Sequence, residues 1–367
     1  MLRKAFRLTQ EALHRYRYGA PGAIVTLNEW RAQHPDGWVH AALPDPVPRI
    51  QPRRFGARPL DLAARIAPIP EMGCLILPGG RAVAAGNHTF AADGTIVRET
   101  TWQNELLKPG LIHSVFPPAR RLAGTCLSLL SEFSAENYGH FVLDALGRVE
   151  VARMAGYAPG DFDHVYLQRP PSRTARQLLE AVGIDPSRCI SADVEPSIVA
   201  ERLVVTTFPG TKANYARFVP RALRRPFDAD GVSGTRRIFI PRGGNRRPAN
   251  QAELIAIARR FDFEVYDWQA VADEVRHFRE AGIVVGAHGA DLSNIAVCHP
   301  GTRILEMIPT DHVHPYFYTI AEGAGLDYSY LAGVSESHRP PGTFGPSLAD
   351  FHVDEAEFSV ALAALAA

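Results

Sequence analysis

The chain has 367 residues, enough for two domains, and its 46% hydrophobic and 21% charged content is ordinary for a globular protein. Its 39 Lys and Arg residues balance its 39 Asp and Glu residues, so the chain has no overall positive charge that would attract nucleic acid. No apolar stretch approaches the ~20 residues that a membrane helix needs. The cysteines form no zinc-binding pattern and are interpreted as buried thiols of a reducing compartment: Cys74, Cys126, Cys189 and Cys298.

The first 120 residues predict an N-terminal extension. Residues 1–18 combine basic side chains with apolar ones at roughly helical spacing, which predicts an amphipathic helix docked on the protein's own surface. The alternative is a helix lying on an anionic membrane face. Residues 21–59 are rich in proline and tryptophan with poor periodicity and predict irregular structure. Short strands separated by glycine turns then predict a β-meander at 74–77, 81–84 and 95–98.

Residues 121–225 alternate between strand and helix patterns. Because such alternation builds a parallel sheet, this region predicts a first Rossmann-like half. The predicted strands cover 127–130, 164–167 and 203–207, and the predicted helices follow Asn137 and cover 172–182. The segment 208–235 is rich in proline and glycine and predicts a linker.

The helix that follows Asn137 carries candidate acid–base chemistry. Asn137 is the expected N-cap, and His140 and Asp144 lie four residues apart, on one face beside an apolar stripe. A histidine held by a carboxylate can take a proton from a hydroxyl group. The alternative is a histidine that merely caps the start of the helix.

Residues 226–367 repeat the alternation and predict a second Rossmann-like half. Its predicted strands cover 237–241, 264–266, 283–286, 302–308 and 351–353. Its predicted helices cover 251–261, 271–281 and 355–366, the last of which is expected to pack back on the core.

Two loops of this half combine strand ends with polar side chains. Arg242, Arg246 and Arg247 follow one strand, and guanidinium groups suit diphosphate oxygens, although a solvated basic loop is the alternative. After strand 283–286 comes a turn of small residues and an expected helix, whose free N–H groups and dipole attract phosphate. The candidate ligands at this second loop are His288, Gly289, Ala290, Asn294 and, near the end of the next strand, Glu306.

Three formal matches to other chemistry are interpreted as chance. Asp161 with Asp163 and Asp228 with Asp230 match an Asp-x-Asp metal motif, but both pairs fall in turn-like stretches where aspartate is common. Cys298 beside His299 lacks the spacing of a known nucleophile. No metal ligand is therefore predicted.

The run HGADLSN at 288–294, followed by PGT at 300–302 and Glu306, resembles the C-terminal signature of glycosyltransferase family 61. That family includes secretory protein O-linked N-acetylglucosamine transferases, plant xylosyl- and arabinosyltransferases and bacterial proteins of capsule synthesis. The arginine loop with Asn250 and the run NYGH at 137–140 also resemble it. The resemblance covers roughly 132–309, about half of the chain.

The resemblance implies a GT-B fold: two Rossmann-like halves that face each other across a cleft. It implies an inverting glycosyltransferase that moves a hexose or pentose from a nucleotide-sugar to a glycan or lipid-linked glycan in capsular or exopolysaccharide synthesis. His140 with Asp144 would be catalytic, and Glu136 and Asn137 would lie on the acceptor side. The donor would contact Arg242, Arg246, Arg247, Asn250, His288, Gly289, Ala290, Asn294 and Glu306.

No cofactor is expected, metal dependence stays open, and the expected location is the cytoplasm, with contact to the inner membrane face through residues 1–18 as an option. The competing interpretation is a non-catalytic nucleotide- or glycan-binding subunit of a polysaccharide assembly system. An unrelated α/β hydrolase is a weaker alternative, because the nucleophile is missing.

Overall fold

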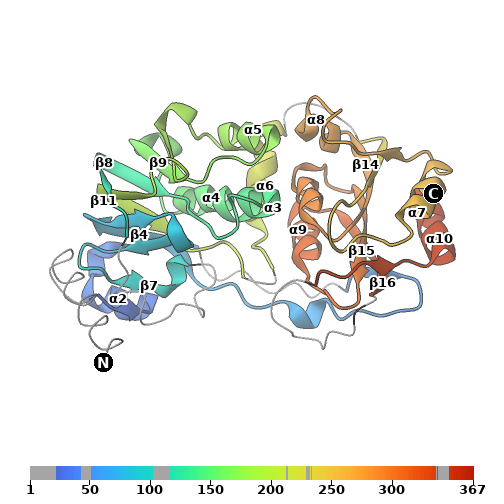
Figure 1. Ribbon diagram of the computed structural model, residues 1–367, viewed down its shortest axis with the longest axis horizontal. Helices are drawn as coiled ribbons and strands as arrows, with labels where there is room; N and C mark the ends of the chain where they lie inside the picture. The colour runs from blue at the N-terminus through green and yellow to red at the C-terminus, as the bar shows by residue number, and fades with distance from the viewer. Residues whose placement is uncertain are drawn as a thin grey trace. The chain divides into compact units, whose positions relative to one another are not determined.

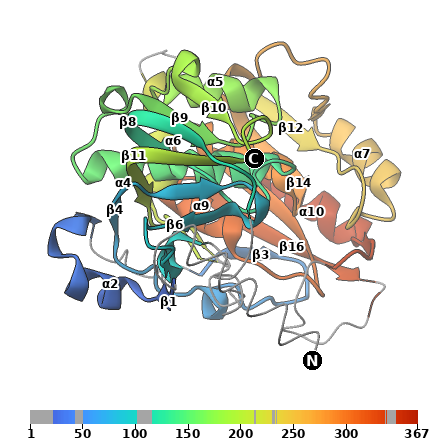
Figure 2. The same ribbon diagram turned by 60° about the vertical axis from the view of Figure 1, so that its left-hand side comes forward.

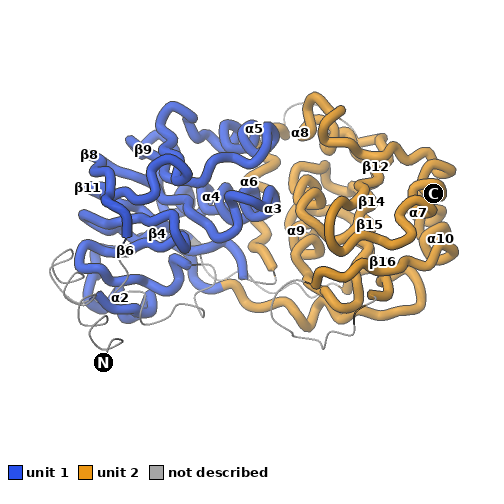
Figure 3. The backbone as a smooth tube through the Cα atoms, viewed as in Figure 1, with its two compact units in different colours: residues 1–44, 70–212 blue, residues 45–69, 213–367 orange. Residues whose placement is uncertain are grey.

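The computed structural model describes residues 22–42, 51–101, 116–211, 214–228, 232, 234–335, 337 and 347–367. The helix predicted at 1–18 lies outside these residues. The chain divides into two compact units, residues 1–44 with 70–212 and residues 45–69 with 213–367 (Figures 1 and 3). Both units combine helices with their own sheet, so the predicted mixed α/β class is confirmed.

Unit 1 is built on a sheet with the order β10-β9-β8-β11-β4-β2. Its parallel strands are β8 (Arg120–Ser128), β9 (His164–Leu167), β10 (Cys189–Ser191) and β11 (Ser197–Thr206). Its antiparallel strands are β4 (Met72–Pro78) and β2 (Trp38–Ala42). Counted along the chain from β8, the parallel strands lie in the order 3-2-1-4. The chain therefore reverses its direction across the sheet between β8 and β11, the point where α/β proteins place ligands.

The short strands predicted at 74–77, 81–84 and 95–98 are present, but their predicted arrangement as a β-meander is wrong. Strands β4 and β5 (Arg81–Val83) both pair with β11, at successive segments of it, and β7 (Ile96–Val97) pairs with β1 (Ile24–Val25) instead. The side chains of β4 are buried on both faces of the sheet. This is expected of an internal strand and not of a meander packed on the outside of the domain. The turn at Gly79, with φ of 63°, separates β4 from β5.

The irregular structure predicted for 21–59 is also wrong in part. Helix α2 (Leu27–Gln33) begins at Thr26, whose side chain and that of Glu29 form a capping box. Leu27 and Trp30 of this helix pack into the core of unit 1. The helix is too short to show a clear period, but its capping signal was present in the sequence.

Unit 2 is built on a parallel sheet with the order β13-β12-β14-β15-β16. Its strands are β12 (Arg236–Ile240), β13 (Glu264–Val265), β14 (Ala281–Ala287), β15 (Arg303–Pro309) and β16 (Asp327–Ser335). Counted along the chain from β12, the order is 2-1-3-4-5, so the reversal falls between β12 and β14. The predicted strands of this half are therefore confirmed. The edge of β16 is completed by β3 (Arg53–Phe55) and β17 (Phe351–His352).

Helices cover both faces of this sheet. On one face α7 (Gln251–Arg259) and α10 (Glu355–Ala366) lie side by side, as Figures 1 and 2 show, and close the main core of the unit. This confirms that the last helix packs back on the core. The other layer contains α6 (Phe218–Arg224), α8 (Glu274–Arg279) and α9 (Tyr316–Ala324).

Helix α6 lies inside the predicted linker at 208–235, so that prediction is wrong for this part. Pro220 stands in the first turn of the helix, where proline removes no intrahelical hydrogen bond, and Val219 and Leu223 are buried. Across the part of the chain that the structure describes, no helix is both long and apolar enough to span a membrane.

Candidate functional site

The predicted pair His140 and Asp144 lies on the helical segment that follows β8. Asn137 is the N-cap, as predicted, because its side chain accepts the His140 backbone N–H at 3.3 Å. The short helix α3 (Tyr138–His140) then runs through a π-helical turn, Phe141–Ala145, into α4 (Gly147–Met154). Such turns often occur at functional sites. The cap is made by Asn137 and not by the His140 ring, which disfavours the alternative interpretation of His140.

The two side chains form a close ionic hydrogen bond. Nδ1 of His140 lies 2.6 Å from Oδ2 of Asp144. The Asp144 side chain is 1% exposed, whereas that of His140 is 21% exposed. Burial by itself lowers the pKa of His140, but the charge and hydrogen bond of Asp144 outweigh burial, and the net pKa is raised. The His140 imidazole is therefore partly exposed to solvent and is hydrogen-bonded to the buried Asp144 carboxylate.

Arg148 is a site residue that the sequence reasoning missed. Its side chain is fully buried. Its guanidinium donates to the carbonyls of Leu130 (2.5 Å), Ser128 (3.0 Å) and Thr206 (3.1 Å) and to the Thr206 hydroxyl (2.7 Å). These acceptors lie at the carboxyl ends of β8 and β11, where the strand order reverses. The only signal in the sequence was an arginine one turn beyond Asp144 beside an apolar stripe.

Arg148 also supplies a positive charge near Asp144. Burial lowers the pKa of Arg148 to about 10, and the charges of Glu132 and Asp144 oppose that shift, so the guanidinium stays protonated at neutral pH. Within the described chain, Oδ1 of Asp144 is buried without a hydrogen-bond partner. A buried carboxylate with one unpaired oxygen is costly unless charges of opposite sign stand nearby. Arg148 and His140, four residues to either side, provide them.

In unit 2 the loop after β12 brings Arg242 to the end of β14. The Arg242 backbone is held by Gln251, which accepts its N–H at 2.7 Å and donates to its carbonyl at 3.2 Å. Nε of Arg242 donates to the carbonyl of Asn245 at 2.7 Å. A Cβ added to Gly289 would lie 1.7 Å from Nη1 of Arg242. The space above Gly289, expected to admit a ligand, therefore holds the Arg242 guanidinium.

Arg246 is a second cation of the same loop. Its φ of 57° is left-handed, a strained conformation for a residue with a side chain. Nη1 donates to the carbonyl of Ser347 at 3.0 Å, while Nε is buried and finds no hydrogen-bond partner in the described parts of the chain. Burial and the neighbouring Arg242 lower the pKa of Arg246 to about 10, and Asp311 opposes this. A buried, unpaired donor on a cation suits an anionic ligand.

His288 stands at the end of β14 and is held by Glu306 of β15. Nδ1 of His288 lies 2.5 Å from Oε1 of Glu306, and the Tyr328 hydroxyl donates to Oε2 at 2.5 Å. Glu306 is fully buried, and both its oxygens are engaged inside the protein. The carboxylate therefore orients His288, so that Nε2 is the ring nitrogen available to a ligand.

Two further histidines of this region were missed. His312 and His314 follow β15, and their ring centroids lie 4.4 Å apart; His288 lies 5.2 Å from His312 and 6.2 Å from His314. Burial, His288, Arg65 and Arg246 lower the pKa of His314 to about 4. Burial and neighbouring positive groups lower the pKa of His312 further. The signal was a His-x-His pair directly after a predicted strand.

The other predicted donor residues lie at the edge of this cluster or inside the fold. Arg247 is 52% exposed and 3.7 Å from Asp350. The Asn250 side chain donates to the carbonyl of Val353 at 2.8 Å and accepts its N–H at 3.3 Å, so it links the loop to the last helix. Asn294 is buried within a 3₁₀ helix, Ala290–Val297, that stands where an α-helix was expected. On the acceptor side, Glu136 is exposed.

The residues interpreted as chance matches have local roles. Asp161 accepts the backbone N–H of Ala158 at 2.7 Å, and Asp163 accepts that of Thr125 at 2.8 Å. Asp228 pairs with Arg224, and Asp230 lies outside the described residues. Among the residues that the structure describes, no group of three or more His, Cys, Asp or Glu side chains is arranged to hold a metal ion.

The cysteines offer no nucleophile. Burial raises the pKa of Cys298 to about 12, and its thiol donates to the Phe278 carbonyl at 3.2 Å. All four cysteines are free; three are buried as predicted, and Cys189 is partly exposed.

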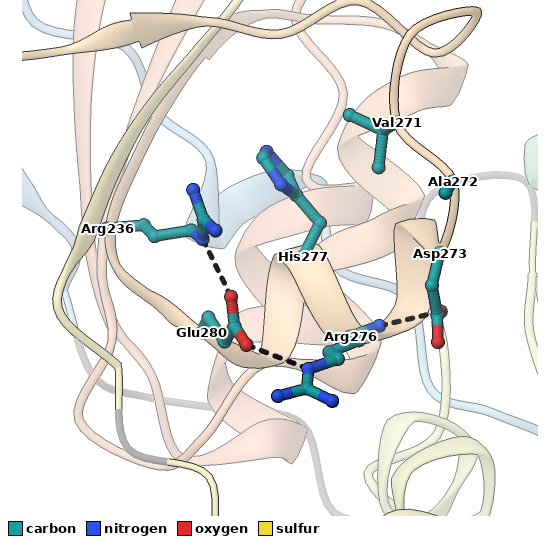
Figure 4. A pocket seen from close by; sticks show the side chains of 7 residues that line it. All are labelled: Arg236, Val271, Ala272, Asp273, Arg276, His277 and Glu280. Carbon is teal, nitrogen blue, oxygen red and sulfur yellow. Dashed lines mark hydrogen bonds and ion pairs between the residues drawn. The ribbon is translucent and has the colours of Figure 1, made fainter.

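A depression of about 400 Å³ lies beside α8, away from the predicted residues (Figure 4). Its arginines are already paired with carboxylates: Arg236 binds Glu264 at 3.1 Å and Glu280 at 2.8 Å, and Arg276 binds Glu280 at 2.9 Å. It therefore lacks the unpaired positive charge that a diphosphate requires. Its lining consists of Arg236, Val271, Ala272, Asp273, Arg276, His277 and Glu280.

Comparison with known proteins places these sites in a family context. A sequence model of the family Glycosyltransferase 61 matches residues 138–305. The match includes His140, Asp144, Arg148, Arg242 and His288. It ends just before Glu306, and so before His312 and His314.

Individual relatives match shorter segments. A beta-1,2-xylosyltransferase of Arabidopsis thaliana is 39% identical over 59 residues, 16% of this chain and 11% of the relative. A protein O-linked-mannose beta-1,4-N-acetylglucosaminyltransferase 2 of Canis lupus familiaris is 35% identical over 104 residues, 26% of this chain and 18% of the relative. The chain thus spans under a fifth of the length of either relative. Together the matches support a glycosyltransferase, and these relatives are plant and mammalian and not of the capsule type.

Replacement of Arg148 tests whether it fastens the ends of β8 and β11. Arg148→Met should lower the free energy of unfolding by about 3–5 kcal/mol, because it leaves buried carbonyls and the Asp144 carboxylate without their cation. Urea denaturation measures this, with Arg120→Met, an exposed arginine of β8, as the control expected to cost under about 1 kcal/mol. If Arg148→Met does not fold, Thr206→Val removes one partner and should cost about 1–3 kcal/mol. A cost equal to that of the control would contradict the assignment.

Proposed function

We propose that the chain is an inverting glycosyltransferase that moves a sugar from a nucleotide-sugar to a hydroxyl group of a glycan. The observation that carries the proposal is the cluster of two arginines and a histidine at the strand-order reversal of unit 2. Arg242, Arg246 and His288 converge there, within the segment similar to Glycosyltransferase 61. Ligands of open α/β sheets bind at this point.

The donor would place its diphosphate against these groups. Guanidinium groups bind phosphate oxygens through paired, charge-assisted hydrogen bonds, and the buried Nε of Arg246 is a donor that the described protein residues do not use. Nε2 of His288, oriented by Glu306, would add a further contact. As the sugar departs, negative charge grows on the diphosphate, and fixed cations would stabilise it.

His140 would serve as the base for the acceptor. The acceptor oxygen attacks the anomeric carbon and gives its proton to Nε2 of His140, while the bond from that carbon to the β-phosphate oxygen breaks and leaves its electrons on the diphosphate. Attack from the face opposite the leaving group inverts the anomeric centre. Asp144 would stabilise the imidazolium that forms through the 2.6 Å hydrogen bond at Nδ1.

A GT-B arrangement and a metal-independent reaction are parts of the same proposal. The first is supported by parallel strands with an order reversal in the sheet of each unit. The second is supported by Arg242 and Arg246, which bring positive charge to the place where the diphosphate would lie. Arg247, Asn250, Asn294 and Ala290 stay predicted donor contacts, and Glu136 and Asn137 stay predicted acceptor contacts. Gly289 is not kept among them, because the Arg242 guanidinium fills the space above it.

The biological setting is proposed from the sequence resemblance. It is the synthesis of capsular or exopolysaccharide in the cytoplasm, with a glycan or lipid-linked glycan as acceptor and membrane contact through residues 1–18. Transfer assays that compare free and lipid-linked acceptors test this setting. A strict preference for a peptide-linked glycan would contradict it.

A donor-only assay separates an enzyme from a binding subunit. Wild-type protein with a nucleotide-sugar and no acceptor should release nucleoside diphosphate slowly, because water can replace the acceptor hydroxyl. The rate should not change when EDTA is added, since the diphosphate charge would be met by side chains. A complete lack of turnover with every donor and acceptor, in a protein that binds nucleotide, would favour the non-catalytic subunit. Loss of turnover in EDTA that Mn²⁺ restores would refute metal independence.

The donor site is tested by the affinity for nucleoside diphosphate. Arg242→Ala should weaken binding by about 1.5–3 kcal/mol, the contribution of a hydrogen bond to a charged group. Gly289→Ala should weaken it in the same direction, because the new Cβ occupies the place of the Arg242 guanidinium. Calorimetry measures both, with Arg276→Ala as the control, an exposed arginine of the same unit. Equal affinities in all three variants would exclude this site.

The base is tested by rate and pH profile. His140→Ala should lower kcat about 10²–10⁴-fold with little change in nucleotide affinity, whereas His40→Ala, an exposed control in unit 1, should not. The acidic limb should lie above the ordinary pKa of histidine, near 6.5, because Asp144 raises the pKa of His140 and the base works only when neutral. Asp144→Asn should move that limb to lower pH. A larger rate loss in Asp144→Asn than in His140→Ala would instead make Asp144 the base.

A further inference from the structure

His312 and His314 form, with His288, a group of three neighbouring imidazoles at the carboxyl edge of the unit 2 sheet. His288 directly follows β14, and the other two belong to the connection from β15 to α9. The centroids of His312 and His314 lie 4.4 Å apart, and the His314 ring stacks on Tyr316 at 5.6 Å. Both histidines lie beyond the segment that the family model matches.

Most charges that face these two rings are positive. His312 is affected by His288, His314, Arg246 and Arg242. His314 is affected by His288, Arg65 and Arg246. Each of these interactions disfavours a protonated ring. The cluster therefore concentrates positive potential around two imidazoles that stay neutral at physiological pH.

The acidic groups of the region are already engaged. Glu306 is bound by His288 and Tyr328. Asp311 accepts hydrogen bonds from three serine hydroxyls, those of Ser335, Ser337 and Ser347. Neither carboxylate forms an ion pair with His312 or His314. The negative charge that would balance this cluster must therefore come from a bound anion.

The two rings differ in how they can bind an anion. Nδ1 of His312 accepts the backbone N–H of Ser347 at 3.4 Å, so the neutral ring carries its proton on Nε2 and can donate it in a hydrogen bond. No hydrogen bond with the described residues fixes which nitrogen of His314 carries the proton. A diphosphate beside His314 would reverse the electrostatic balance and favour the imidazolium, which donates from both nitrogens.

We propose that His312 and His314 bind the diphosphate of the nucleotide-sugar, and that His314 takes up a proton from solvent when the donor binds. The inference rests on the proposed function and extends it to the charge state of the site. The neutral His312 ring donates a hydrogen bond, and the protonated His314 ring adds positive charge that stays through departure of the sugar. In this way the cluster would supply charge that many nucleotide-sugar enzymes take from a metal ion.

Proton uptake is measured by calorimetry in buffers of different ionisation enthalpy. The probes are uridine diphosphate xylose and uridine diphosphate N-acetylglucosamine, chosen because the relatives transfer xylose and N-acetylglucosamine. Both phosphates of these probes are fully ionised diesters near neutral pH, so any proton taken up belongs to the protein. Wild-type protein should show net uptake between pH 6 and 8, and its affinity should fall as pH rises, by at most about tenfold per unit.

Variants assign the uptake to one ring. His314→Gln should abolish the uptake, flatten the pH dependence and weaken binding about 10- to 100-fold. His312→Gln should weaken binding and keep the uptake. His277→Gln, which replaces a partly buried histidine on α8 of the same unit, should change neither. Thermal unfolding confirms that each variant is folded.

The outcomes separate this inference from the proposed function. Binding with a heat that does not depend on buffer, or uptake that persists in His314→Gln, would overturn the inference and leave a donor site in place. A folded wild-type protein that binds neither probe nor any other nucleotide-sugar would overturn both. If His314→Gln does not fold, the buffer dependence of the wild-type protein still decides, because its absence refutes proton uptake.

Discussion

Both units depend on the same geometric constraint: the carboxyl ends of two parallel strands diverge where the strand order reverses, and polar main-chain groups are left there without a neighbouring strand. In each unit an arginine reaches this point. In unit 1, the Arg148 guanidinium donates hydrogen bonds to carbonyls at both strand ends, and these bonds occupy its N–H groups. In unit 2, Arg242 lies over Gly289, and Arg246 keeps an unpaired buried donor. The first arrangement stabilises the fold, and the second suits a ligand.

The surrounding charges give histidine opposite properties in the two units. In unit 1 the buried Asp144 raises the pKa of His140, which makes a base that works above the ordinary range of the side chain. In unit 2 burial, together with His288, Arg65 and Arg246, lowers the pKa of His314 to about 4. The same imidazole therefore fits proton transfer in one place and anion-dependent protonation in the other.

The comparisons and the structure support different parts of the functional proposal. The family match and the transferase names of the relatives support glycosyl transfer, over a segment that holds His140, Arg242 and His288. The structure adds the contacts inside each site, such as the buried Glu306 behind His288. The second site also contains a strained residue, because Arg246 has a left-handed backbone while its guanidinium donates to the Ser347 carbonyl.

The sequence by itself determined the elements whose signals are local. Strand 164–167, helix α10 and the Asn137 cap were predicted from periodicity and capping, and the His140–Asp144 pair from a spacing of four residues, because each depends on neighbours along the chain. Only the tertiary structure decided which strand β4 pairs with, because pairing joins segments far apart in sequence. It also decided that Asn250 forms hydrogen bonds with Val353 and that Glu306 forms one with His288. In the same way, only the tertiary structure showed that Arg148 and His314 belong to the sites. These roles come from burial and from charges on other elements, which no local pattern of residues encodes.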